Sequence, residues 1–139
     1  MDRLKAARER AGKSPAELAA AMEISRPHYY DLESCNDELY MTVSLSELRR
    51  LCAELDISPR YLFSGEQTAS ETSTSFSSLA KIVATYLDDN HMSLASFEDM
   101  VGWTLDDFTT TPERAWDWNV DCLRDVCAAL GVQWLDALP

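Results

Sequence analysis

Three pairs of adjacent acidic residues are the side chains in this sequence best suited to acid–base chemistry or to binding a cation. They are Asp88-Asp89, Glu98-Asp99 and Asp106-Asp107. A calcium loop needs carboxylates at alternate positions and a glycine for its sharp turn, and the sequence has no such pattern. Acidic residues scattered along helices usually form a solvated face. We therefore interpret the three pairs as surface acids.

The nucleophilic and metal-ligating residue types also lack functional spacing. His28 and His91 have no neighbouring ligands, so a structural or solvated role is expected for both. The four cysteines form no CxxC motif, which indicates reduced thiols in a cytoplasmic protein. The glycine-rich loops that cradle phosphates are missing as well. The sequence predicts a protein that is not an enzyme and that uses no cofactor and no metal.

The net charge limits the classes of partner. The chain has 139 residues and carries 24 acidic and 12 basic side chains, for a net charge of −12. A protein that coats nucleic acid, or that binds an anionic membrane surface, needs clustered Lys and Arg. With 46% hydrophobic residues the chain is not a disordered acidic tail. The sequence shows neither an apolar run long enough to span a bilayer nor a secretory signal, so we expect a cytoplasmic protein with no membrane partner.

The elements that position these side chains are predicted to be helices. In the first half, Ser14-Pro15 followed by Glu17 is typical of a helix start with a capping box. Ser25, Ser44 and Ser58 give further start signals, and a polar loop is expected over residues 34–38. The leucines between Leu45 and Leu55 form an apolar stripe. The first half therefore reads as five short helices without a strand.

A Ser/Thr-rich segment divides the chain. Residues 64–77 contain eight Ser or Thr in fourteen positions, which is typical of a linker. We therefore predict one domain over residues 1–63 and a second, acidic domain over residues 78–139. In the second domain, Ser93 is expected to cap a helix, and Thr104 to cap a further helix that carries Leu105 and Phe108.

Tryptophan is concentrated in the second half. Trp103, Trp116, Trp118 and Trp134 could line a groove for a partner, but packing in the core is the favoured interpretation. Trp116 and Trp118 are two positions apart and cannot face the same core from one helix. Either one of them is exposed or the next helix begins after them.

The second half repeats part of the first. Residues 48–57 match residues 123–132 at an offset of 75, and the segment from Ser14 to Ser25 maps onto Ser93 to Thr104 at an offset of 79. Self-similarity at a nearly fixed offset indicates repeated structural units. We therefore predict an all-α fold with two related helical bundles in tandem, which could pack into one body.

Several motifs of the first half occur in a fixed order. They are Arg8, Ser14 to Ala19, Ile24 to Arg26, Leu32-Glu33, the later leucine stripe and Tyr61-Leu62. In this order they resemble the Xre/Cro, lambda-repressor-like helix-turn-helix family over about residues 3–63. Residues 76–138 look like a degenerate second copy. The resemblance implies that Arg8 and Glu33 form the buried ion pair that ties the first helix to the third.

The resemblance also implies DNA binding by the third helix, over residues 26–33, in the major groove. Arg26 could read guanine, with His28 and Tyr30 beside it. Residues 1–30 contain six basic and four acidic side chains. The basic residues of this segment that could meet phosphates are Arg3, Lys5, Arg10 and Lys13.

The sequence departs from the family at several contact positions. Pro15 stands where Gln often contacts phosphate, and Glu23 replaces the usual glycine of the turn. Pro27 cannot hydrogen-bond a base, and Asp31 repels phosphate. The loop over residues 36–38, often basic in the family, has the sequence Asn-Asp-Glu. Arg26 alone remains a clearly suitable base-reading residue.

Two functional hypotheses follow. Residues 67–139 contain three basic and twelve acidic side chains, and the expected recognition helix of this half carries Asp106 and Asp107. In the first hypothesis the N-terminal unit binds duplex DNA as a transcription regulator, and the acidic unit dimerises or receives a partner. In the second the chain has lost DNA binding and acts as an adaptor, antirepressor or immunity-like factor. Asp106 and Asp107 would then dock on a basic protein.

Overall fold

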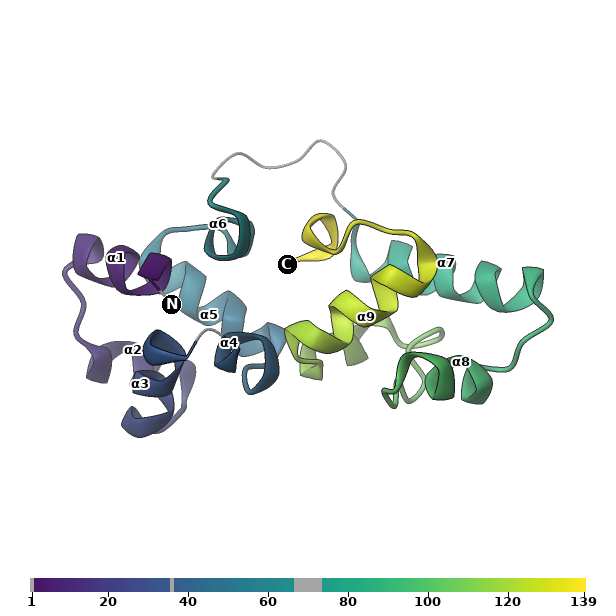
Figure 1. Cartoon of the computed structure of the whole chain (residues 1–139), viewed down its shortest axis with the longest axis horizontal. Helices are drawn as coiled ribbons and strands as arrows, with labels where there is room; N and C mark the ends of the chain where they lie inside the picture. Colours follow the sequence, from purple (N-terminus) through teal and green to yellow (C-terminus); the bar gives the residue numbers. More distant parts are fainter. Residues whose placement is uncertain (1, 36, 67–73) are drawn as a thin grey trace.

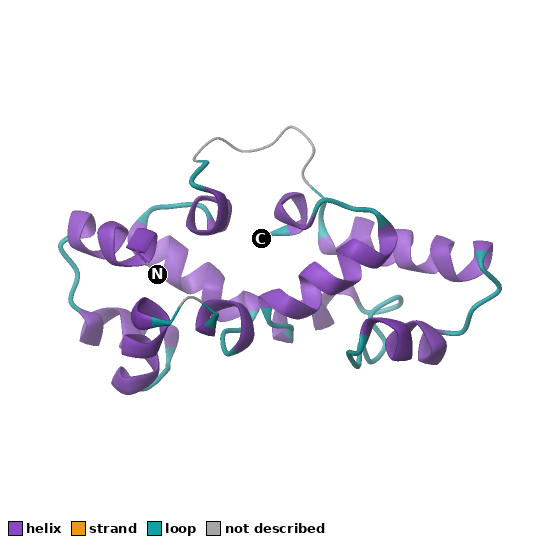
Figure 2. Ribbon diagram, in the orientation of Figure 1, coloured by secondary structure: helices purple, strands orange, loops and turns teal. Residues whose placement is uncertain are grey.

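The computed structural model describes residues 2–35, 37–66 and 74–139, and helices account for all of its regular elements (Figure 2). The N-terminal unit contains α1 (Asp2–Ala11), α2 (Pro15–Met22), α3 (Arg26–Ser34), α4 (Glu38–Met41), α5 (Leu45–Leu55) and α6 (Pro59–Ser64). The second unit contains α7 (Phe76–Asp89), α8 (Leu94–Val101), the 3-10 helix η1 (Pro112–Asp117), α9 (Val120–Leu130) and the 3-10 helix η2 (Trp134–Ala137). The expected all-α class is confirmed.

Serine caps begin most of these helices. The Ser14, Ser25, Ser44, Ser58 and Ser93 side chains each accept a hydrogen bond from the backbone N–H three residues later. Such a cap satisfies a donor that has no partner inside the helix. The expected capping box at Ser14 is only half present in the described structure, whereas Ser44 and Glu47 form a complete one. The short helix α4 ends the predicted polar loop and was not expected.

The ends of the linker are ordered by the neighbouring helices. α6 extends to Ser64, and Ser75 caps α7, which begins at Phe76. Residues 67–73 of the predicted linker lie outside the described residues. Of the predicted linker, the structure therefore describes residues 64–66 and 74–77, of which Ser64 belongs to α6 and residues 76–77 belong to α7.

The two units pack against each other. Near the middle of the molecule α5 packs against η1 and α4 packs against α9, and α6 contacts η2 (Figure 1). The Leu45 N–H donates to the Trp118 carbonyl at 2.8 Å, and the Asn119 side-chain amide donates to the Met41 carbonyl at 2.9 Å. Buried residues of both units, including Leu45 and Trp118, belong to one hydrophobic cluster. The described chain therefore folds as one body.

The tryptophans take different places in this body. Helix α9 begins after Trp116 and Trp118, with Asn119 as its cap. Trp118 is buried against Phe108, whereas Trp116 is half-buried and lies against Phe76 and Arg49. This confirms the sequence alternative in which the next helix begins after the two tryptophans.

The cysteines differ in accessibility. Cys35 is exposed, while Cys52, Cys122 and Cys127 are buried and unpaired. Burial raises the pKa of each of these three thiols to about 12, because an apolar environment disfavours the thiolate.

We expect only Cys35 to react quickly with a thiol reagent such as DTNB in the native protein, because the thiolate is the reacting form and the other three thiols are buried. Absorbance at neutral pH should show one fast thiol, and all four after unfolding in denaturant. The matched control is Cys35→Ser, which should remove the fast phase and leave the slow one. Two or more fast thiols in the native wild type would contradict the burial of this core.

Candidate nucleic-acid interface

The candidate site is built on α2, the following turn and α3. The turn residue Glu23 adopts a left-handed conformation with φ of 61°, which is unfavourable for a residue with a Cβ atom by roughly 1 kcal/mol. Its carboxylate pairs with Arg50 of α5 at 3.1 Å. The sequence placed an acid at this turn in place of the usual glycine. The structure shows that a long-range ion pair offsets the charge of Glu23.

An ion pair fixes α3 against α1. Arg8 donates to both carboxylate oxygens of Glu33, at 2.5 and 3.4 Å, and also to the Lys13 carbonyl. The hydroxyl of Tyr29, which is buried, donates to the same carboxylate at 2.9 Å. The pKa of Arg8 is raised chiefly by its hydrogen bond to Glu33, and the pKa of Tyr29 is raised chiefly by burial. The pairing implied for Arg8 and Glu33 is present.

The first turn of α3 faces away from this anchor. Arg26 is exposed and makes no hydrogen bond or ion pair within the described residues. The side chain of Tyr30 is 54% exposed. His28 forms a 2.7 Å hydrogen bond with the Thr42 hydroxyl, which accepts or donates according to the histidine tautomer. Thr42 and Arg50 were missed by sequence reasoning, because each reaches the site from a distant part of the chain.

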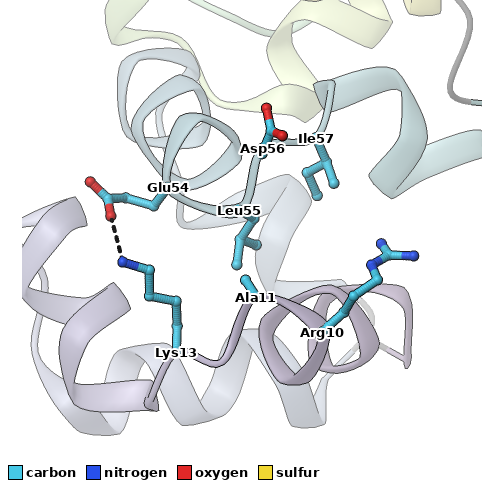
Figure 3. Close-up of a pocket in the computed structure, with 7 residues that line it drawn as sticks. All are labelled: Arg10, Ala11, Lys13, Glu54, Leu55, Asp56 and Ile57. Atoms are coloured by element: carbon cyan, nitrogen blue, oxygen red, sulfur yellow. Dashed lines mark ion pairs between the residues drawn. The ribbon is translucent and has the colours of Figure 1, made fainter.

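The basic residues of α1 and its following turn are spread over other surfaces. Arg3 donates to the Leu62 carbonyl of α6, and Lys5 is exposed without a hydrogen bond or ion pair in the described structure. Arg10 and Lys13 line a hollow of about 530 Å³ between the ends of α1 and α5 (Figure 3). Lys13 pairs there with Glu54 at 3.6 Å. Three of these four basic side chains therefore contact α5 or α6 rather than α3.

The hollow itself has mixed charge. Its lining combines the basic side chains of Arg10 and Lys13 with the acidic side chains of Glu54 and Asp56. The apolar residues Ala11, Leu55 and Ile57 complete it. The guanidinium of Arg10 also lies 5.7 Å from the ring centroid of Tyr61, a cation–π distance. Balanced charge gives this hollow little attraction for a phosphate. We do not include it in the interface.

The second unit lacks the expected counterpart of α3. Thr104 does not cap a helix, and residues 106–110 form successive turns instead. The Glu98 carboxylate accepts from the Leu105 N–H at 2.6 Å, and Asp106 is left-handed with φ of 53°. Three threonines and Pro112 follow, all unfavourable for continuing a helix. The prediction of a recognition helix over residues 105–108 is therefore wrong.

Asp106 and Asp107 have different surroundings. Both are exposed, but Asp107 pairs with Arg114 at 2.7 Å and accepts from the Thr111 hydroxyl at 2.9 Å. The hydrogen bond from Arg114 is the main cause of the lowered pKa of Asp107. Because no helix begins here, the two carboxylates do not sit at a helix N-terminus as the sequence suggested. Asp107 stabilises the local turn.

Two other kinds of functional feature are a metal site and a membrane-spanning helix. In the part of the chain that the structure describes, no group of three or more His, Cys, Asp or Glu side chains is arranged to hold a metal ion. No described helix combines the length and the apolar character needed to cross a bilayer.

The chain has no match among curated proteins and none among solved structures. A family model described as helix-turn-helix matches residues 4–62. This range spans α2, the Glu23 turn and α3 together with the helices that pack on them. This match supports the resemblance of residues 4–62 to the Xre/Cro, lambda-repressor-like helix-turn-helix family.

Proposed function

We propose that the protein is a DNA-binding transcription regulator that places the first turn of α3 in the major groove. The observation that carries this proposal is the exposed guanidinium of Arg26, which has no hydrogen bond or ion pair among the described residues. It lies on a helix whose other end is anchored by Arg8 and Glu33. A fixed helix presents a side chain precisely, and an arginine with free donors can bond guanine O6 and N7 together. The helix-turn-helix family match supports the same function.

The remaining contacts are assigned by position. His28 and Tyr30 lie on the same helix and reach bases or sugars beside those that Arg26 reads. Four basic side chains could contact phosphate, although three of them already have protein partners. They are Arg3, Lys5, Arg10 and Lys13. We therefore expect few phosphate contacts and a shallow dependence of affinity on salt. In this proposal the acidic second unit serves dimerisation or partner binding rather than DNA contact.

The proposed contact of Arg26 can be tested by fluorescence anisotropy on a duplex selected from a random library by the full chain. Arg26→Ala should weaken binding by about 5- to 140-fold, since a bidentate contact to guanine contributes about 1 to 3 kcal/mol. Lys81→Ala is the matched control, because it removes one exposed positive charge from the second unit. Equal losses for the two variants would contradict a base-reading role for Arg26.

A second candidate function is favoured by the charge of the second unit. Residues 67–139 hold twelve acidic and three basic side chains, and Asp106 is exposed. Such a unit repels DNA and attracts a basic protein, as an adaptor, antirepressor or immunity-like factor would. Random duplex at about 50 mM salt distinguishes the two functions, because non-specific DNA binding is strongest at low salt. A chain that binds no duplex under that condition favours the adaptor.

A further inference from the structure

The backbones of the two units share unusual conformations at matching positions. Gly12 and His91 both have positive φ, as do Glu23 and Gly102, and both pairs are 79 positions apart. Asp56 and Gly131, which end α5 and α9, form a third such pair 75 positions apart. Each of these six residues follows the end of a helix, where a left-handed residue is common, so the agreement shows that helices of the two units end at matching positions. Asp106 also has positive φ but has no such counterpart, because the residue 79 positions before it is Pro27, which does not have positive φ.

The contacts between the units are reciprocal. Ser44 and Asn119, which are the caps of α5 and α9 and lie 75 positions apart, pair with each other in an antiparallel bridge. Arg49 lies over the ring of Trp116 at 5.2 Å, and Arg124, again 75 positions later, lies over Tyr40 at 4.8 Å. Each unit therefore gives the other the same kind of contact. Two-fold symmetric dimers have this property, since residue i meets j and j meets i.

The paired face of the N-terminal unit is well covered. Val43 and Leu45 are fully buried beside the junction, and Arg60 of α6 forms a 2.7 Å ion pair with Asp136 of η2. The rings of Tyr40 and Phe63 pack against Trp134, with centroids 6.3 and 5.4 Å away. A second copy of the chain could reach this face only by displacing α9 and η2.

We propose that the second unit occupies, within one chain, the place that a second copy of the N-terminal unit would take in a symmetric dimer. The protein is then a monomer with the architecture of a dimer. Only one of its two units keeps a recognition helix, because residues 106–110 replace that helix in the other. A symmetric pair reads two half-sites about one helical turn apart. Resting on the proposed DNA-binding function, this inference assigns to the chain a single, non-palindromic half-site.

The mass of the full chain in solution gives the first test. Sedimentation equilibrium over a wide range of concentrations should give 15.7 kDa throughout. A mass that doubles as the concentration rises would overturn the proposal, because it would show a face still open to a second copy. This measurement does not depend on DNA, so it remains decisive even where the proposed function fails.

A cut in the linker tests the internal interface directly. A protease site that replaces residues 67–73 allows the folded chain to be cut between the two units. The two pieces should then remain together in a one-to-one complex. Asp136→Arg places a second cation beside Arg60 and should make the cut pieces separate. Arg60→Asp combined with Asp136→Arg restores the opposite charges and should hold the pieces together again. Cut pieces of the otherwise unchanged chain that separate spontaneously would overturn the proposal.

DNA selection with the full chain gives the third test. The recovered duplexes should share one non-palindromic motif and bind one chain each. A palindromic motif that binds two chains would overturn the inference and leave the proposed function standing. A chain that selects no duplex but stays monomeric overturns the proposed function alone.

Discussion

Trp118→Ala is expected to lower the free energy of unfolding by about 3 to 5 kcal/mol, the usual range for removing a large buried aromatic side chain. Trp118 is only 7% exposed, and its ring lies 4.5 Å from that of Phe108, centroid to centroid. Its carbonyl also accepts from Leu45 across the junction. The substitution therefore opens a cavity in the second unit, next to the surface that holds the two units together. Urea unfolding followed by circular dichroism measures the loss.

Trp116→Ala is the matched control, two positions away in the same segment. Trp116 is half-buried and contacts Phe76 and Arg49 at its surface. Loss of these contacts should lower stability by about 1 to 2 kcal/mol. Equal effects for the two tryptophans would contradict their assignment to different environments. Two separate unfolding transitions in wild type would contradict the single packed body.

Local sequence signals predicted most of the helices. A serine before an apolar repeat fixes a helix start through a hydrogen bond only three residues long, so Ser25 and Ser58 could be identified without tertiary information. The same reasoning found the apolar stripe of α5, whose Leu48 and Leu51 are fully buried. Features that depend on neighbours in sequence could therefore be predicted.

Features that depend on distant neighbours were not accessible. Thr104 looked like a cap, but the Glu98 carboxylate takes the Leu105 N–H and the chain turns instead of forming a helix. The pair Arg60–Asp136 joins residues 76 positions apart, and Arg50 reaches Glu23 from another helix. No spacing rule brings such residues together, because the packing of separate helices decides which charges meet. The sequence thus predicted candidate DNA contacts, but not that Arg3 and Lys13 among them already have protein partners.

Glu33→Ala is expected to lower the free energy of unfolding by about 3 kcal/mol. The side chains of Arg8 and Glu33 are only 15% and 11% exposed, so removal of the carboxylate leaves a guanidinium in a place that water reaches poorly. Breaking a buried pair at one partner costs about 3 to 5 kcal/mol, and partial exposure places this case at the lower end. The Tyr29 hydroxyl loses its acceptor as well. Urea unfolding at neutral pH measures the change.

The second unit suggests the control for this prediction. Leu87 and Phe108 stand 79 positions after Arg8 and Tyr29 in the sequence and are apolar, although residues 106–110 form turns where the N-terminal unit has α3. Phe108 is fully buried and Leu87 is half-buried. The triple variant Arg8→Leu, Tyr29→Phe, Glu33→Leu should therefore recover much of the stability lost in Glu33→Ala, since it removes both charges and the hydroxyl together and leaves only the Lys13 carbonyl without its donor from Arg8. If the triple variant is less stable than Glu33→Ala, the network contributes stability of its own. The apolar packing of the second unit would then be no substitute for it.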